Sequence, residues 1–343
     1  MSDTPSTDEH ALRIEALYQD RLVPCYAHRP DHLDAMFRAS VQRRPQALAI
    51  EEGERSLTYA QLDLEVGRLS AGWAARGIGS GDRVALFLGN RIEFVLVLLS
   101  LWRLGAIAVP IGIRQSAAEL EYMLGQCGAC ALVFEGTLAD RLPRPDAIPG
   151  VGLLVHCLDA DENGEVLQAS GLPSVLLADL SCDPPLRASP DGLSDQAPAC
   201  IMYTSGTTGH PKGAVLSHLL LRNAANVARC MHVEPDDVVL GHMPFYHVAG
   251  CIATLAMCLL VGCTPGPVGR GSGFAAGWRL PGLPAAVSCA GRAADHAGTP
   301  HHRHRDGACD VQPVPAAARD RHLRSVGLAH RAFWRCSHAR GHH

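Results

Sequence analysis

The sequence has neither a long apolar run nor a second cysteine pair, and these absences exclude several classes of protein. Its charge-free apolar segment at residues 251–263 holds thirteen residues, whereas a membrane-spanning helix needs about 20. The cysteines are scattered apart from Cys127 and Cys130, and a four-cysteine zinc site would need another pair at such spacing. We therefore expect no membrane span, no zinc site and reduced thiols.

Two further absences concern location and charge. The N-terminus lacks the basic and apolar regions of a secretory signal peptide, which predicts a cytoplasmic protein. Neither sign of charge dominates, because the formal net charge is -4 at pH 7, so no nucleic-acid partner is expected. The chain has 343 residues, of which 47% are hydrophobic. That is enough for a sizeable core and about two domains.

Lysine occurs once, and this residue, Lys212, lies in the most informative stretch of the sequence. A predicted strand at residues 200–204 is followed by small residues whose backbone can curl and point its amides inward, as an anion site requires. Lys212 follows Pro211 and can place an ammonium group over the same anion. The candidate phosphate-binding residues are Thr204, Ser205, Gly206, Thr207, Thr208, Gly209 and Lys212.

The spacing differs from that of the common P-loop, in which the lysine directly follows a glycine and leads into a helix. Here His210 and Pro211 separate Lys212 from Gly209, and residues 213–216 form a short apolar run suited to a returning strand. We expect the loop to join two strands, with Ser217 capping a following helix. An ordinary turn would be shorter than these ten residues from Thr204 to Gly213.

The string Tyr-Thr-Ser-Gly-Thr-Thr-Gly-His-Pro-Lys-Gly at residues 203–213 resembles the phosphate-loop signature of the adenylate-forming enzymes. These include acyl-CoA synthetases, luciferases and peptide-synthetase adenylation domains. The resemblance implies ATP and Mg²⁺ as cofactors, a carboxylic acid, most simply a fatty acid, as substrate, and coenzyme A as acyl acceptor. It also implies that Lys212 grips phosphates and that Thr204 helps to bind magnesium.

A second string, Met-Pro-Phe-Tyr-His-Val-Ala-Gly at residues 243–250, presents Tyr246 and His247 after a predicted strand. The family has a similar string whose histidine lies against the acyl substrate near the reacting carboxylate. By this resemblance His247 is a catalytic residue and Tyr246 a substrate contact. The alternative for His247 is a histidine whose ring merely binds a strand-end carbonyl.

Apolar periodicity predicts the fold class. Strand and helix patterns alternate along the chain, which favours an α/β architecture with parallel-sheet layers and helices on both faces. Residues 140–196, rich in Pro, Gly, Asp and Ser, are expected to form a surface excursion. The predicted helices lie at residues 33–44, 56–77, 91–104 and 117–125, and the predicted strands at 48–50, 81–88, 106–111 and 129–134.

The composition changes after about residue 264. Residues 266–343 contain no Glu, Lys or Tyr, hold half of the 18 histidines, and carry a charge of +7 from 11 Arg and 4 Asp. Three explanations are open: a nucleic-acid-binding tail, a metal site around residues 301–304, and translation out of frame, which explains the abrupt change best. We expect this segment to be disordered because it lacks apolar periodicity.

These contrasts divide the chain into a polar N-terminal arm (1–32), an AMP-binding region (33–263) and a tail (264–343). The resemblance also implies later elements that the sequence does not show: a Tyr-Gly-x-Thr-Glu string, a ribose-binding aspartate and a second catalytic lysine. The chain then corresponds to the truncated N-terminal portion of the family's large domain. The alternatives are a non-catalytic fragment with residual nucleotide binding and, more distantly, a nucleic-acid binder.

Overall fold

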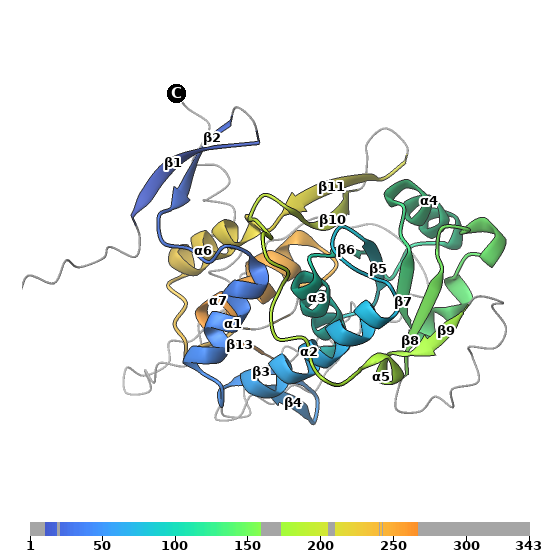
Figure 1. Ribbon diagram of the computed structural model, residues 1–343, viewed down its shortest axis with the longest axis horizontal. Helices are drawn as coiled ribbons and strands as arrows, with labels where there is room; N and C mark the ends of the chain where they lie inside the picture. Colours follow the sequence, from blue (N-terminus) through green and yellow to red (C-terminus); the bar gives the residue numbers. More distant parts are fainter. Residues whose placement is uncertain are drawn as a thin grey trace, which may run out of the picture. The chain divides into compact units, whose positions relative to one another are not determined.

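The computed structural model describes residues 11–18, 21–158, 173–204, 210–239, 241 and 243–266 (Figure 1). The tail beyond residue 266, for which disorder is expected, and the segment Ser205–Gly209 lie outside the described residues. Among the helices of the described part, none is long and apolar enough to cross a membrane.

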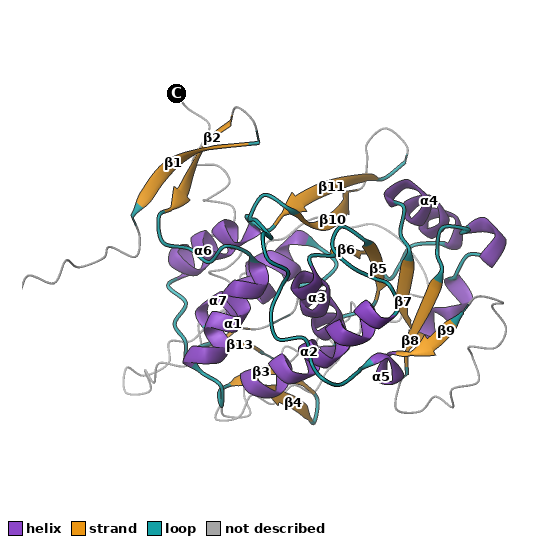
Figure 2. Cartoon of the chain, viewed as in Figure 1, coloured by secondary structure: helices purple, strands orange, loops and turns teal. Residues whose placement is uncertain are grey.

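A seven-stranded sheet in the order β11-β10-β6-β5-β7-β8-β9 forms the centre of the described region (Figure 2). All neighbouring strands in it are parallel except β10 and β11. This confirms the predicted α/β class. The strands are β5 (Arg83–Phe87), β6 (Ile107–Pro110), β7 (Ala131–Glu135), β8 (Leu153–Cys157), β9 (Ser174–Leu176), β10 (Pro198–Thr204) and β11 (Lys212–Ser217).

Helices cover both faces of the sheet because side chains along a strand alternate between its faces. On β5, Val84 and Leu86 belong to the cluster formed with α2 and α3, whereas Ala85 and Phe87 belong to the cluster formed with α4. The helices are α1 (Leu33–Arg43), α2 (Tyr59–Ala75), α3 (Ile92–Leu104), α4 (Ala117–Cys127), α5 (Leu177–Leu180), α6 (Leu220–Met231) and α7 (Met257–Val261).

Local sequence explains where several of these helices begin and end. Thr58 and Ser116 each form a capping box, in which the hydroxyl accepts from a backbone N–H and the side chain three positions on accepts in return from the backbone N–H of the cap residue. Gly105 and Gly128 end α3 and α4 in the left-handed conformation that glycine adopts without steric cost. The helical boundaries were therefore largely predictable.

Shorter elements complete the described chain. A π-helix at Ala249–Ala256 leads into α7, and two 3₁₀ helices occupy Gly136–Arg141 and Pro145–Ala147. The remaining strands form two-stranded sheets: β1 (Leu12–Leu17) with β2 (Arg21–Tyr26), β3 (Leu48–Glu52) with β4 (Arg55–Thr58), and β12 (Val238–Val239) with β13 (Thr264–Pro265).

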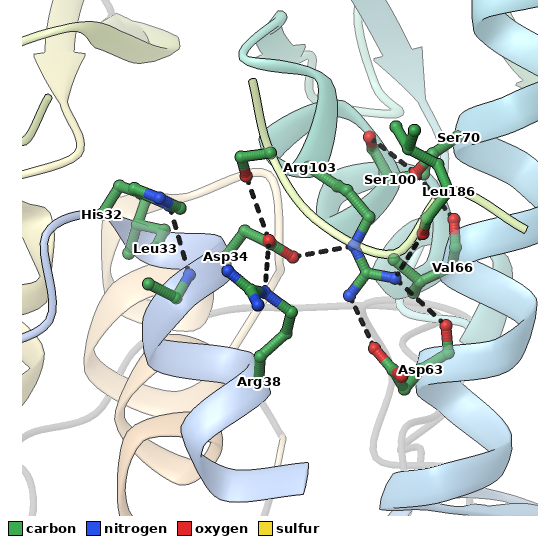
Figure 3. A network of polar contacts seen from close by, with 12 residues as sticks. His32, Leu33, Asp34, Arg38, Asp63, Val66, Ser70, Ser100, Arg103 and Leu186 are labelled. Carbon is green, nitrogen blue, oxygen red and sulfur yellow. Dashed lines mark hydrogen bonds and ion pairs between the residues drawn. The ribbon is translucent and has the colours of Figure 1, made fainter. Parts of the chain in front are cut away.

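A buried ion network joins three helices of one layer. The guanidinium of Arg103 on α3 donates to Asp34 of α1 at 2.9 Å and to Asp63 of α2 at 2.6 Å. Figure 3 shows Arg103 lying between these two carboxylates. Arg38 and Ser189 also donate to Asp34. The side chains of Arg103 and Asp34 are each only 1% exposed, so the pair is shielded from water.

The structure corrects two expectations. Residues 140–196 are not only a surface excursion, because β8 and β9 extend the main sheet as parallel strands. Their apolar runs are short and separated by turn-forming residues, so sequence periodicity was too brief to identify them. Ser217 is not the N-cap of the next helix: it ends β11, and Leu219 is the N-cap of α6, without a side-chain cap bond. The Ser217 hydroxyl accepts from the Leu219 N–H, at 3.3 Å, just before the helix.

The first 32 residues also hold structure that the sequence did not predict. The β1–β2 hairpin is antiparallel from Leu12 opposite Tyr26 to Leu17 opposite Arg21. Leu17 and Cys25 pack against Leu219, which precedes α6. This contact is long-range, so no local pattern could indicate it.

Candidate functional site

The carboxyl ends of the parallel strands lie along one edge of the sheet, where open α/β sheets bind their ligands. The chain passes from β5 to β6 on one side and then returns to β7 on the other. The strand order therefore reverses between β5 and β7. The loops that follow β5, β6, β7 and β10 are the candidates for a binding site at this edge.

The predicted phosphate loop connects two adjacent antiparallel strands. Thr204 at the end of β10 is paired with Lys212 at the start of β11, and its Oγ1 donates to the Lys212 carbonyl at 3.4 Å. This confirms that the loop joins two strands. Both side chains are exposed, so the ammonium group of Lys212 is accessible to an anion from solvent. The proposed phosphate contacts from Ser205 to Gly209 stay a prediction.

Helix α4 contacts the chain on each side of this loop. Tyr203, just before the loop, donates from its hydroxyl to the Met123 carbonyl at 2.9 Å and to Gln126 Oε1 at 2.5 Å. Burial raises the pKa of Tyr203, which keeps this phenol a neutral donor. The imidazole of His210, just after the loop, stacks on Tyr122 with ring centroids 4.5 Å apart. Both ends of the loop are therefore tied to α4.

Tyr246 and His247 approach the same edge from a distant part of the chain. The Tyr246 ring lies against Gly112, where a Cβ atom would come within 3.3 Å of Cε2. Cys200 of β10 is paired with Ala108 of β6. Thr204 and Gly112, each four residues further along, therefore leave the sheet at neighbouring positions. The Tyr246 ring therefore lies against the end of β6, the strand beside the one that leads into the predicted phosphate loop.

The imidazole of His247 has a defined hydrogen-bonding state. Its Nδ1 accepts from the Ala249 backbone N–H at 3.2 Å. A neutral imidazole that accepts at Nδ1 carries its proton on Nε2. Since His247 is exposed, the Nε2–H group can donate to a bound carboxylate. The alternative, in which the ring only binds a strand-end carbonyl, has no counterpart among the described contacts.

The described residues suit a phosphate better than a magnesium ion. Lys212 offers a cation and Thr204 a hydroxyl, and both are suitable phosphate ligands. Protein-bound Mg²⁺ usually has one or two carboxylate ligands in addition to phosphate oxygens. No group of three His, Cys, Asp or Glu side chains able to hold a metal occurs within the described ranges. Of the candidate ligands, Thr204 alone would then contact the ion.

Sequence reasoning missed Asn90, which follows β5 at the point where the strand order reverses. Its side-chain amide donates to the carbonyls of Gly241 and Met243 and accepts from the Phe245 backbone N–H. These bonds hold the segment that presents Tyr246 and His247. The local signal is an asparagine directly after a buried strand, which marks a loop but does not identify its partner.

Comparisons with known proteins agree with this geometry. A model of the family described as AMP-binding enzyme matches residues 37–278. Long-chain fatty acid transport protein 1 of Rattus norvegicus is 31% identical over 237 residues, covering 68% of this chain and 36% of that protein. Long-chain-fatty-acid–CoA ligase FadD13 of Mycobacterium tuberculosis is 36% identical over 215 residues, covering 62% and 40%.

The fold is also similar to that of solved structures. The apo structure of Mycobacterium smegmatis MbtA has a TM-score of 0.60 and 30% identity, covering 69% of this chain and 43% of that chain. The present chain therefore spans less than half the length of each of these three proteins.

Proposed function

Because this chain belongs to the AMP-binding enzyme family, we propose that it takes part in the ATP-dependent activation of a carboxylic acid, as an acyl-CoA ligase does. A carboxylate oxygen attacks the α-phosphorus of ATP, a new P–O bond forms, and pyrophosphate leaves with the electron pair of the broken bond. The thiol of coenzyme A then attacks the acyl carbon, and AMP leaves. A fatty acid is the proposed substrate, in line with what FadD13 is named for.

One observation carries this proposal: the segment bearing Tyr246 meets the end of β6, which is one strand away from Thr204 on β10 and two strands away from Lys212 on β11. A carboxylate at His247 and a phosphate at Lys212 would then be neighbours. Holding two reactants side by side is the main way in which a protein speeds such a transfer.

Each residue has a proposed role in that arrangement. Lys212 and the loop Thr204–Gly209 would hold the β- and γ-phosphates, and the Nε2–H group of His247 would donate to the acid and orient it. Tyr246 would form one wall of the acid site. Magnesium, when bound, would balance the charge on the phosphates, and Thr204 would supply a hydroxyl ligand.

The test is ATP–pyrophosphate exchange by the purified chain over short-, medium- and long-chain fatty acids and aryl acids, beside a calorimetric measurement of ATP binding. Exchange that depends on a fatty acid, and that His247→Ala abolishes, supports the ligase. ATP binding without exchange favours the alternative, a non-catalytic nucleotide binder. Absence of both would contradict the two proposals together.

A further inference from the structure

Asn90 acts as a clamp, in the sense that three hydrogen bonds of its side chain hold the segment that leads to Tyr246 and His247. Its Nδ2 donates to the Gly241 carbonyl at 3.2 Å and to the Met243 carbonyl at 2.9 Å. Its Oδ1 accepts from the Phe245 N–H at 2.7 Å. Both amide hydrogens and the amide oxygen are therefore used, and the residue is only 8% exposed.

The loop that bears Asn90 is itself held on both sides of this residue. Glu135, the last residue of β7, accepts from the Gly89 N–H at 3.4 Å and forms an ion pair with Arg91 at 3.5 Å. Arg91 is fully buried and also pairs with Glu93 at 2.6 Å. These contacts cross from the β5 loop to β7, so Asn90 projects from a braced position at the reversal of strand order.

The segment held by Asn90 is also tightly packed where it continues to Tyr246 and His247. Phe245 is fully buried, and its ring lies 5.5 Å from that of Phe94. The His247 N–H donates to the Pro244 carbonyl at 3.0 Å. At Gly250 a Cβ atom would lie 2.1 Å from the same carbonyl, so the turn around His247 has little freedom. Tyr246 then lies against Gly112.

From these contacts we propose that Asn90 is a positioning residue for the segment that bears Tyr246 and His247, a role that rests on the proposed function. It acts through Tyr246 and His247 and touches neither reactant. Its predicted effect is on the acid and not on the nucleotide phosphates, because its bonds go to residues 241–245 and none goes to β10 or β11.

An asparagine is needed because the segment offers two acceptors and one donor. Aspartate has nearly the same shape and could still accept from Phe245, but it has no N–H to give to the Gly241 and Met243 carbonyls. Its carboxylate would instead face two carbonyl oxygens. A serine would retain one donor and one acceptor, so its effect should be intermediate.

The test compares Asn90→Asp with a matched control, Asn226→Asp. Asn226 is a part-buried asparagine on helix α6 whose side chain accepts from the Tyr26 hydroxyl. Amide hydrogen exchange of residues 243–251 should speed up roughly tenfold in Asn90→Asp, because the two hydrogen bonds donated by the amide group are lost. The nuclear Overhauser contact between the Tyr246 ring and Gly112 should be lost. Neither should change in Asn226→Asp.

Ligand measurements separate a positioning role from a structural one. With dodecanoate and ATP, Asn90→Asp should raise the KM for the acid about tenfold or more, and its affinity for pyrophosphate should stay within twofold of the unaltered chain. The KM of Asn90→Ser for the acid should lie between the values of Asn90→Asp and of the unaltered chain. The proposal would be overturned if Asn90→Asp weakened the use of the acid and the binding of pyrophosphate equally. It would also be overturned if amide hydrogen exchange and the Tyr246–Gly112 contact stayed unchanged.

Two outcomes stay distinguishable. If the unaltered chain shows no acid-dependent reaction, the ligase function fails, but hydrogen exchange and the Tyr246–Gly112 contact still decide whether Asn90 orders the segment. If Asn90→Asp does not fold, as judged by circular dichroism, the same measurements on Asn90→Ser decide. An Asn90→Ser chain that folds and keeps wild-type exchange would contradict the clamp.

Discussion

Single residues decide charge at the candidate site, and Lys212 is the clearest case. It is exposed at the start of β11, opposite Thr204. As the sole lysine of the chain, it supplies the ammonium that a phosphate loop needs. Several arginine side chains of the described residues are instead held by carboxylates or carbonyls, as Arg103 and Arg83 show. Lys212 is therefore the natural residue with which to test anion binding.

Lys212→Ala should weaken ATP or pyrophosphate binding by about 1.5 to 3 kcal/mol, which is the loss expected for a hydrogen bond to a charged group. Isothermal titration calorimetry would measure it. Arg229→Ala, which removes an exposed positive charge from the last turn of α6, serves as the control and should change little. Equal affinities for Lys212→Ala and the unaltered chain would rule out the phosphate role.

His218 should make stability depend on pH. Burial, followed by the nearby His32, lowers its pKa to about 4. Its Nδ1 accepts from the Leu33 N–H at 3.3 Å, and its Nε2 has no partner among the described residues. The folded state therefore takes up the proton at lower pH than the unfolded state does. The stabilisation is complete above the ordinary pKa of about 6.5 and is lost as pH falls toward 4.

Between pH 7 and pH 5 the loss from this group should be about 2 kcal/mol. Urea unfolding at the two values would measure it, and His218→Gln should reduce the difference. Burial also lowers the pKa of His32, so part of the pH dependence should remain in that variant. A wild-type chain equally stable at both pH values would contradict the prediction.

At the scale of elements, helices are joined by polar contacts that amphipathic patterns do not show. Arg103 is the main example, since it connects α3 to Asp34 of α1 and Asp63 of α2 from a position 1% exposed (Figure 3). A buried arginine among apolar neighbours costs desolvation energy that its carboxylates must offset. The network therefore connects the three helices through charged groups that must stay paired.

Arg103→Met should lower the free energy of unfolding by about 3 to 5 kcal/mol, because it leaves Asp34 short of a partner in the interior. Arg68→Met is the matched control. Arg68 pairs with Glu65 and Asp183 at the surface, where water screens the charges, so its loss should cost far less than the loss of Arg103. Denaturant unfolding of the two variants would measure the difference, and equal costs would mean that the buried pair adds nothing.

At the scale of the whole molecule, the N-terminal hairpin belongs with the region that follows it. Arg29 pairs with Glu15 at 2.7 Å and with Asp195 at 2.6 Å. The hydrogen bond from Arg29 is the main cause that lowers the pKa of Glu15 to about 2, so this carboxylate stays charged at neutral pH. The hairpin is thus tied to the loop that leads into β10.

We propose that the AMP-binding region extends from the hairpin to about residue 265, with the tail as a separate part. Limited proteolysis should first cleave beyond residue 266 and leave a stable product that retains the hairpin, because the described apolar clusters and ion pairs lie before that point. Mass spectrometry of the product would locate its ends. A protected fragment from residues 267–343, or early loss of the hairpin, would contradict this.

The elements with strong local signals could be predicted from the amino-acid sequence. Capping boxes and left-handed glycines set the ends of helices, apolar runs marked the central strands, and the Gly/Ser/Thr stretch before Lys212 predicted a loop between two strands. These features depend on contacts within a few residues, so they can be read along the chain.

Which of these elements contact one another became clear from the folded chain alone. The pairing of β8 and β9 with the sheet, the docking of the hairpin on Leu219 and the clamp from Asn90 to residues 241–245 all join distant segments. Such contacts depend on strand order and on which polar groups are buried together. A local sequence pattern cannot predict either of these. The hairpin and Asn90 have partners that lie more than a hundred residues away along the chain.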